Sequence, residues 1–181
     1  MGALTRLDVR QRARAFLVRV AALTGETTSL QILEGTQTRF VDSVESINSV
    51  RVGSRAGVSL PAHLTSGGKA ILAGMSNRAL LLLYPAEKLG APLTATSTTT
   101  REKLTEELAA VRAQGYSVNY EESTTGLIAV GVAVNGSDRM PVAALTVAGP
   151  AFRMDQTKIL QVAKALQDAV HELEAQLSSP A

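Results

Sequence analysis

The stretch LIAVGVAVNGSDRMPVAALTVAG, residues 127–149, decides the fold. Two apolar runs, residues 127–134 and 140–149, flank the tetrapeptide NGSD at residues 135–138. Asn-Gly is a strong signal for a tight reverse turn between paired antiparallel strands. The preceding segment GYSVNYEE, residues 115–122, has the β-branched and aromatic content of another strand. This part of the chain therefore predicts an antiparallel sheet.

A second strand pair is predicted near the N-terminus. The segments TTSLQILEG (27–35) and TRFVDSVESI (38–47) alternate loosely, and the short connection between them favours an antiparallel hairpin. Strict alternation along the second strand places Phe40, Asp42 and Val44 on one face. The hairpin should join the strands described above in one sheet.

Helical periodicity and capping residues predict the remaining elements. Residues 8–24 form an amphipathic pattern whose arginines we expect on a solvated outer face. Further helices are predicted from Thr65 or Ser66 to about Gly74, from Asn77 to Tyr84, from a Thr99 cap to Gly115, and along the apolar stripe from Ile159 to Leu177. Residues 50–61 are predicted to have an irregular backbone. The order of elements indicates an α+β fold, a mainly antiparallel sheet with helices packed on its faces.

Composition excludes several classes of function. The chain has 181 residues, 45% of them hydrophobic, which is enough for one well-packed domain. A formal net charge of +2 argues against the broad basic face of a stand-alone nucleic-acid binder. The absence of Cys excludes disulfides and thiol catalysis, and two His residues argue against a metal site. No apolar run approaches the ~20 residues that span a bilayer, and no secretory signal is visible, so we expect no membrane partner.

The tetrapeptide Ser66-Gly67-Gly68-Lys69 is open to three interpretations. It matches the S-x-x-K pattern of serine acyl-enzymes, in which the Lys helps to remove the Ser proton. It also places backbone N–H groups at a helix start, where a ligand anion is favoured. The third interpretation is structural, because glycine suits close packing of a helix against a sheet. The sequence favours neither of the last two interpretations over the other, and the first stays an alternative.

Strand parity indicates a small cavity. Leu127 and Ala129 share one face of their strand, as Thr146 and Ala148 do of theirs. These mostly small or hydroxyl-bearing side chains leave room above the sheet that Leu or Phe would fill. If the helix start at Gly67 overlooks that face, the result is a cavity that is apolar below and carries hydrogen-bond donors above. A core of small side chains under a close helix is the alternative.

The acidic pair Glu121–Glu122 and the two histidines are not expected to take part in catalysis or metal binding. Glu121 and Glu122 are neighbours, so on a strand they would point to opposite faces and form no catalytic pair. We expect them on a solvated edge or in one local salt bridge. His63 is expected to have a capping or packing role, and His171 to lie on the polar side of the last helix.

The sequence resembles the effector-binding domain of IclR-type bacterial transcriptional regulators over nearly its whole length. The blocks that carry the resemblance are LTGETTSLQILEG (23–35), VDSVESI (41–47), GVSLPAHLTSGGKAILA (57–73), ELAAVRAQGYSVNYEESTTGLIAVGVAV (107–134) and VAALTVAGPAFRM (142–154). Their collinear order and spacing make the match specific.

The resemblance implies a GAF-like fold, a curved mainly antiparallel sheet with helices packed on both faces, one side of which cups a small molecule. The residues it assigns to effector binding are Ser66, Gly67, Asn119, Leu127, Ala129, Thr146 and Ala148, with Val52 and Leu60 in the apolar wall. The chain departs from the family pattern at two places. Asn119 stands where an acid is common, which removes a charge that would repel carboxylates. Thr146 and Ala148 stand where hydroxyl residues are usual, so one hydroxyl group is lost.

The resemblance also implies partners and domain organisation. We expect a cytoplasmic, allosteric regulator domain without a cofactor, which binds a small anionic organic acid or aromatic effector and assembles as a homodimer or tetramer. Residues 1–10 are interpreted as a remnant of an interdomain linker and residues 11–181 as the effector-binding domain. DNA would be bound only through an N-terminal winged helix-turn-helix that this chain lacks.

Two other functions are retained as alternatives. One is a serine acyl hydrolase that uses Ser66 and Lys69. The other is a purely structural oligomerisation domain, in which the protein's own side chains fill the cavity.

Overall fold

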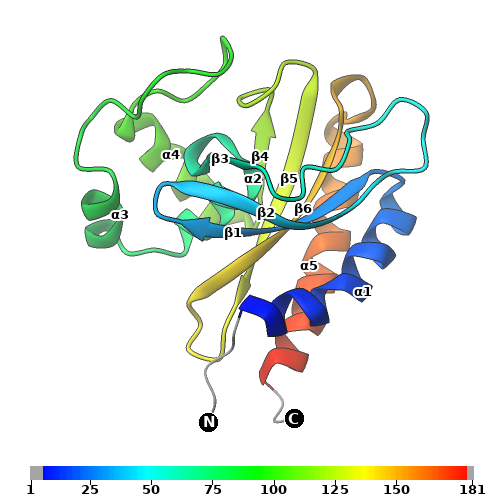
Figure 1. Ribbon diagram of the computed structural model, residues 1–181. Helices are drawn as coiled ribbons and strands as arrows, with labels where there is room; N and C mark the ends of the chain where they lie inside the picture. The colour runs from blue at the N-terminus through cyan, green and yellow to red at the C-terminus, as the bar shows by residue number, and fades with distance from the viewer. Residues whose placement is uncertain (1–5, 179–181) are drawn as a thin grey trace.

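The computed structural model describes residues 6–178, which form one curved antiparallel sheet flanked by helices. The strands are β1 (Thr27–Glu34), β2 (Gln37–Val44), β3 (Ser59–Pro61), β4 (Ser117–Tyr120), β5 (Leu127–Asn135) and β6 (Pro141–Pro150). They lie in the order β3-β2-β1-β6-β5-β4. Figure 1 shows that the sheet is curved, so that β1 and β2 run in a different direction in the view from the long strands β5 and β6. The β1–β2 and β5–β6 pairings confirm both strand pairs predicted from the sequence.

Helices cover both faces of the sheet. On one face lie α1 (Arg6–Thr24) and α5 (Gln156–Ser178), side by side at the lower right of Figure 1. On the other face α2 (Ser66–Ala73) packs against the strands, and α3 (Asn77–Leu83) and α4 (Arg101–Gln114) join it in a separate apolar cluster. Two short 3-10 turns, η1 (Ala62–Leu64) and η2 (Ala151–Arg153), follow β3 and β6. Helix α1 runs without a break across residue 10, and Val9 and Ala13 are buried in the same core. The predicted α+β fold class is confirmed.

The two faces of β5 differ in side-chain size, and this difference positions the site. Val130, Val132 and Val134 point into the large apolar core beneath α1 and α5. The alternate residues Ala129 and Ala133 face the side that carries α2. Because small side chains occupy that second face, α2 lies close to the sheet.

Capping residues account for where the helices begin and end. Thr65 caps α2, since its Oγ1 accepts the Gly68 amide at 2.9 Å. Helix α4 is capped by Thr100, whose Oγ1 accepts the Lys103 amide at 3.2 Å, and not by Thr99 as predicted. The prediction was wrong by one residue because the helix begins at Arg101, so that Thr99 lies one residue before the cap, where its carbonyl accepts the amide of Leu89.

An irregularity in β2 overturns the simple alternation expected there. The β1–β2 register shifts between Leu30 and Gln31, so that Leu30 pairs with Asp42 while Gln31 pairs with Phe40. An extra residue of this kind sends the residues before and after it to different faces. Phe40 consequently lines the cavity described below, whereas Asp42 accepts a hydrogen bond from Arg14 of α1 on the opposite face.

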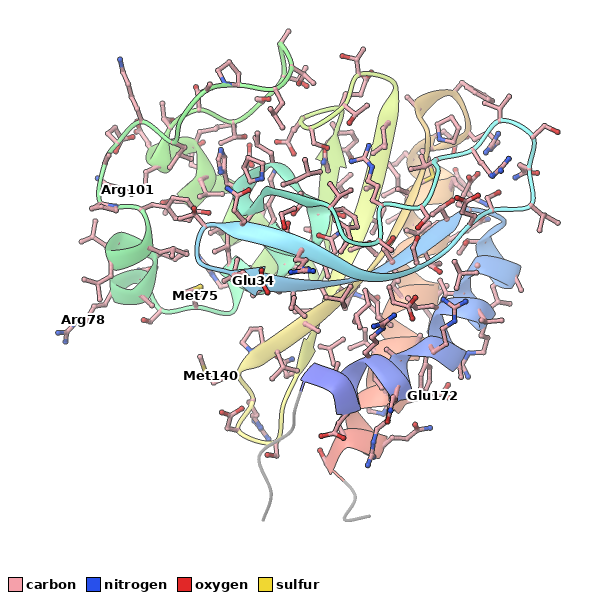
Figure 2. All side chains as sticks on the ribbon, viewed as in Figure 1. Glu34, Met75, Arg78, Arg101, Met140 and Glu172 are labelled. Carbon is pink, nitrogen blue, oxygen red and sulfur yellow. The ribbon has the colours of Figure 1, made fainter. Side chains whose placement is uncertain are left out.

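The arginines of α1 make intramolecular contacts along its outer face. Arg14 pairs with Asp42 at 2.8 Å, and Arg19 pairs with Glu172 of α5 at 2.9 Å. Figure 2 labels Glu172 on α5, beside α1. Both arginine side chains are about half exposed, as expected for a solvated helix face.

Candidate functional site

One narrow cavity lies on the α2 face of the sheet, with the β2–β3 loop (residues 45–58) along its mouth. The empty space between its walls, mouth included, is about 390 Å³. In this conformation the lining side chains leave room for about one water molecule. The lining residues are Thr27, Ser29, Gln31, Phe40, Val52, Gly53, Arg55, Leu60, Thr65, Ser66, Asn119, Ser123, Leu127, Ala129, Thr146 and Ala148. A ligand larger than water therefore needs the mouth to open.

The structure brings together most of the site residues proposed from the sequence. Eight of the nine line this cavity, namely Val52, Leu60, Ser66, Asn119, Leu127, Ala129, Thr146 and Ala148. The ninth, Gly67, lies beneath Gln31, and a Cβ at Gly67 would come 2.5 Å from Gln31 Oε1. Gln31 itself lines the cavity, so Gly67 contacts a lining residue without lining the cavity itself.

The glycines at the start of α2 allow close packing. A Cβ on Gly68 would lie 2.0 Å from the Ala62 carbonyl oxygen, and one on Gly131 of β5 would lie 2.7 Å from the Ser66 carbonyl oxygen. The Gly68 amide is already bound by Thr65 Oγ1. The packing interpretation left open by the sequence therefore holds at Gly68, and the Gly68 amide is not free for an anion.

Replacing Gly131 by Ala is expected to lower the free energy of unfolding by about 1–3 kcal/mol, because the new methyl group would meet backbone atoms of α2 that cannot rotate away. Urea unfolding measures this loss. A matched control is Gly53→Ala, whose Cβ would have Glu45 Oε1 as its nearest neighbour at 3.9 Å, and which should change stability by less than about 0.5 kcal/mol. Equal urea midpoints for Gly131→Ala and Gly53→Ala would refute the close-packing role of Gly131.

The cavity holds two buried polar atoms without a hydrogen-bond partner in the described part of the chain. These are Ser66 Oγ, in a residue that is 1% exposed, and Gln31 Oε1, in a residue that is 2% exposed. The other end of the Gln31 amide donates to Thr146 Oγ1 at 3.2 Å. A buried polar atom that has lost water without gaining a partner costs roughly 1–3 kcal/mol. A ligand that supplies the missing hydrogen bonds would recover that energy.

Asn119 is held in place by three hydrogen bonds. Its Nδ2 donates to the Leu64 carbonyl at 2.7 Å and to Ser123 Oγ at 3.2 Å, while its Oδ1 accepts the Glu122 amide at 2.8 Å. The side chain is buried in the cavity wall. Asn119 therefore fixes the β4–β5 turn against η1, and that turn forms one side of the cavity.

Sequence reasoning missed several polar lining residues. Thr27, Ser29 and Gln31 alternate along β1, and the β1–β6 register places Ser29 opposite Thr146 and Thr27 opposite Ala148. Their period of two was visible in the sequence, but their pairing with β6 was not. Arg55 lies in the β2–β3 loop, where no periodic signal exists.

Lys69 does not serve Ser66. Its Nζ lies 2.6 Å from Glu122 Oε2 and 2.7 Å from Glu107 Oε2, and its side chain is 3% exposed. Ser66 Oγ has no general base within hydrogen-bonding distance among the described residues. The geometry of a Ser-Lys acyl-enzyme, in which the Lys abuts the Ser hydroxyl, is therefore not present.

The expectation for Glu122 was wrong, because it is buried and its partner Lys69 is distant in sequence. Strand β4 ends at Tyr120, so the alternation rule does not extend to this residue. Burial raises the pKa of the Glu122 carboxyl, and the charge of Lys69 acts in the opposite direction. A single ammonium shared with Glu107 does not offset the loss of water.

Two negative findings apply to residues 6–178. No cluster of His, Cys, Asp and Glu is arranged to hold a metal ion there. None of the helices formed by these residues is both long and apolar enough to cross a membrane.

Within residues 6–178, a curved antiparallel sheet carries a small lined cavity with a loop along its mouth, an architecture shared with the effector-binding domains of transcriptional regulators. The family model described as the C-terminal domain of bacterial transcriptional regulator IclR matches residues 1–175. The chain belongs to this family, whose members are transcriptional regulators and not enzymes.

Similar proteins support the same assignment. The HTH-type transcriptional regulator XynR of Escherichia coli K12 is 31% identical over 175 residues, which make up 97% of this chain and 69% of XynR. The regulator Rv1719 of Mycobacterium tuberculosis is 33% identical over 84% of this chain and 58% of its own length.

Solved structures agree with the sequence comparisons. Thermotoga maritima IclR superposes with a TM-score of 0.90 at 30% identity, covering 96% of this chain and 70% of that one. A double mutant of the inducer-binding domain of Acinetobacter PobR, in complex with 3-hydroxybenzoic acid, superposes with a TM-score of 0.81 at 26% identity. The superposition covers 98% of the PobR chain and 96% of this chain.

Proposed function

We propose that this chain is the effector-sensing part of a transcriptional regulator and that its cavity binds a small organic acid. The observation that carries the proposal is the pair of buried, unpartnered polar atoms on Ser66 and Gln31, both in the cavity wall. A core filled by the protein's own side chains usually satisfies such atoms internally, and these two are the unpartnered atoms on the residues that line this cavity. Atoms left unpaired in a cavity are the recognition groups expected of a ligand site.

The charge of the cavity favours an acid. None of the lining side chains carries a carboxylate, since Asn119 stands at the position where the family resemblance leads us to expect an acid. The complex of the PobR inducer-binding domain with 3-hydroxybenzoic acid supports an aromatic or similarly compact acid as the effector class.

We further propose that ligand binding changes the geometry of a homodimer or tetramer and so alters operator binding by an N-terminal DNA-binding domain. The relatives named above are HTH-type regulators, and the matched region is only 58–69% of their length. Coupling of ~1–3 kcal/mol between the two sites would change operator affinity about 5–150-fold.

Calorimetric titration and thermal unfolding with a panel of aromatic and aliphatic hydroxy acids test the proposal. A compound that binds only the native state raises its stability by RT ln(1 + [L]/Kd). We expect at least one acid to give both heat and a higher melting temperature. If no compound in the panel shifts the melting temperature, the domain is a structural oligomerisation module and the sensor proposal fails.

Filling the cavity should abolish binding. Ala129 of β5 is buried and lines the wall, so Ala129→Leu places a bulky side chain in a space that now admits about one water molecule. We expect no heat with any acid that binds the wild type. The matched control Ala109→Leu adds the same group to an exposed position of α4 and should bind normally. Unchanged affinity in Ala129→Leu would place the ligand elsewhere.

A further inference from the structure

Arg55 is the one ionisable side chain among the residues that line the cavity. It is half-buried, and burial lowers the pKa of its guanidinium. Its side chain donates to Thr124 Oγ1 at 3.0 Å, and no carboxylate within residues 6–178 forms an ion pair with it. A guanidinium that is partly removed from water loses hydration energy, and a single neutral hydroxyl partner does not fully replace it. A carboxylate is the group that its planar fork binds best.

The position of Arg55 sets it at the mouth of the cavity. Arg55 belongs to the β2–β3 loop, while Thr124 belongs to the turn between β4 and β5, and both neighbouring segments contribute lining residues. Their hydrogen bond therefore joins the two sides of the opening. Thr124 is exposed, so the bond can exchange with solvent or with a ligand.

The buried end of the cavity, opposite Arg55, carries neutral hydrogen-bonding groups and no charge. Ser66 and Gln31 are almost fully buried, unlike Arg55, so their free atoms lie on the cavity floor. Ser66 Oγ can donate a proton and Gln31 Oε1 can only accept one. A ligand hydroxyl group satisfies both, because it accepts from Ser66 and donates to Gln31. Gln31 Oε1 does not suit a second carboxylate, since it would face a negative oxygen.

We infer that Arg55 selects for a carboxylate, which takes the place of Thr124 as its partner, and that the effector is a hydroxylated carboxylic acid whose hydroxyl group reaches Ser66 and Gln31. The inference rests on the proposed function and deepens it. It assigns an orientation, with the carboxylate at the mouth and the hydroxyl group on the floor.

The test compares matched probes on wild-type protein and three variants. The probes are two triads, 3-hydroxybenzoate with 3-hydroxybenzamide and benzoate, and lactate with lactamide and propionate. Arg55→Gln should weaken binding of the hydroxy acid about 10- to 100-fold, because a charge-assisted pair is lost, and should leave the weaker amide unchanged. Arg55→Lys should recover part of the loss. Arg51→Gln is the matched control, since Arg51 lies in the same loop, pairs with Glu45 and does not line the cavity.

Two further variants test the two ends separately. Ser66→Ala should lower the preference for 3-hydroxybenzoate over benzoate about tenfold or less, as for a neutral hydrogen bond. Thr124→Ala should bind the acid at least as tightly as wild type, because Thr124 competes with the ligand for Arg55. Unfolding without ligand shows whether each variant is folded.

The possible outcomes separate this inference from the proposed function. If wild type and Arg55→Gln bind the acids equally, the role of Arg55 is refuted while the sensor function stands. If the unhydroxylated acids bind as tightly as the hydroxy acids, the assignment of the floor is refuted. Preferential binding of the amides overturns the choice of an acid. Absence of all binding overturns the sensor proposal together with the inference.

Discussion

Replacing Lys69 by Met is expected to lower the free energy of unfolding by about 3–5 kcal/mol near neutral pH. The Lys69 side chain is 3% exposed and its ammonium contacts two carboxylates. Met retains much of the apolar stem but removes the charge. Glu122, whose side chain is 8% exposed, would then be left in the interior without a cation. Urea unfolding followed by circular dichroism measures the loss.

The neighbouring polar groups cannot replace the missing cation. Thr98 Oγ1 lies 2.7 Å from Glu107 Oε1 and 3.1 Å from Glu122 Oε1, but its single proton serves one carboxylate at a time. Glu107 is the more exposed of the two acids, with 22% of its side chain accessible, so water can solvate it in part. The penalty therefore falls mainly on Glu122.

A matched control separates burial from ion pairing. Lys164 forms an ion pair with Asp168 at 2.6 Å, but these two side chains are 72% and 58% exposed. Lys164→Met should change stability by less than about 1 kcal/mol. Adding Glu122→Gln to Lys69→Met removes the uncompensated charge and should recover a large part of the loss. Equal effects of Lys69→Met and Lys164→Met would contradict the role assigned to the buried cluster.

The loss in Lys69→Met should depend on pH. Burial already raises the pKa of Glu122 in the folded protein, and removing Lys69 takes away the influence that opposes this rise. A carboxyl with a raised pKa binds its proton more tightly in the folded state than in the unfolded state. Lowering the pH from about 7 towards about 4.3, the ordinary Glu value, therefore favours folding, and the deficit relative to wild type should shrink. A deficit that is constant with pH would show that the cost is not electrostatic.

The Lys69 cluster joins two walls of the cavity. Lys69 follows Ser66 by one turn of α2, and its partner Glu122 donates its amide to Asn119. Helix α2 and the β4–β5 turn are thereby tied together on the side opposite the β2–β3 loop. Opening of the mouth is then expected from movement of the loop, while α2 stays fixed.

Much of the fold was predictable because its signals are local. The two apolar runs at residues 127–134 and 140–149, with Asn135-Gly136 between them, are enough to specify β5 and β6. The irregularity in β2 was not predictable, since it turns Asp42 towards Arg14 of α1. Contacts of that kind depend on tertiary packing and leave no period in the sequence.

The residues of the candidate site also differ in whether a local pattern in the sequence could predict them. Ala129 and Thr146 were identified from parity and from the family resemblance, and both line the cavity. Gln31 was missed because its strand meets β6 across more than a hundred residues, a pairing that no local pattern encodes. Arg55 was missed because an irregular loop gives no indication of which residue will turn inward. Two of the residues to which we assign ligand recognition, Gln31 and Arg55, are therefore ones that sequence patterns do not reveal.

Replacing Arg153 by Met is the second change expected to have a large effect, a loss of about 2–4 kcal/mol. Arg153 Nε and Nη2 donate to Glu26 Oε1 and Oε2 at 2.7 and 2.9 Å, and the Glu26 side chain is 2% exposed. Removing Arg153 leaves that carboxylate buried and unpaired. The estimate lies below that for Lys69 because 26% of the Arg153 side chain is exposed, which lets water replace part of the interaction.

Arg153 also anchors the β2–β3 loop, since it donates to the Val50 carbonyl at 2.6 Å. In Arg153→Met we therefore expect faster hydrogen exchange in residues 45–58 as well as lower stability, because the loop loses an attachment to η2. Arg51→Met is the control, since Arg51 pairs with Glu45 in the same loop but both side chains are about 40% exposed. The double variant with Glu26→Leu should regain stability but not slow exchange in the loop, because the Val50 contact stays absent. Recovery of both properties would show that Glu26, and not the anchor on Val50, controls the loop at the cavity mouth.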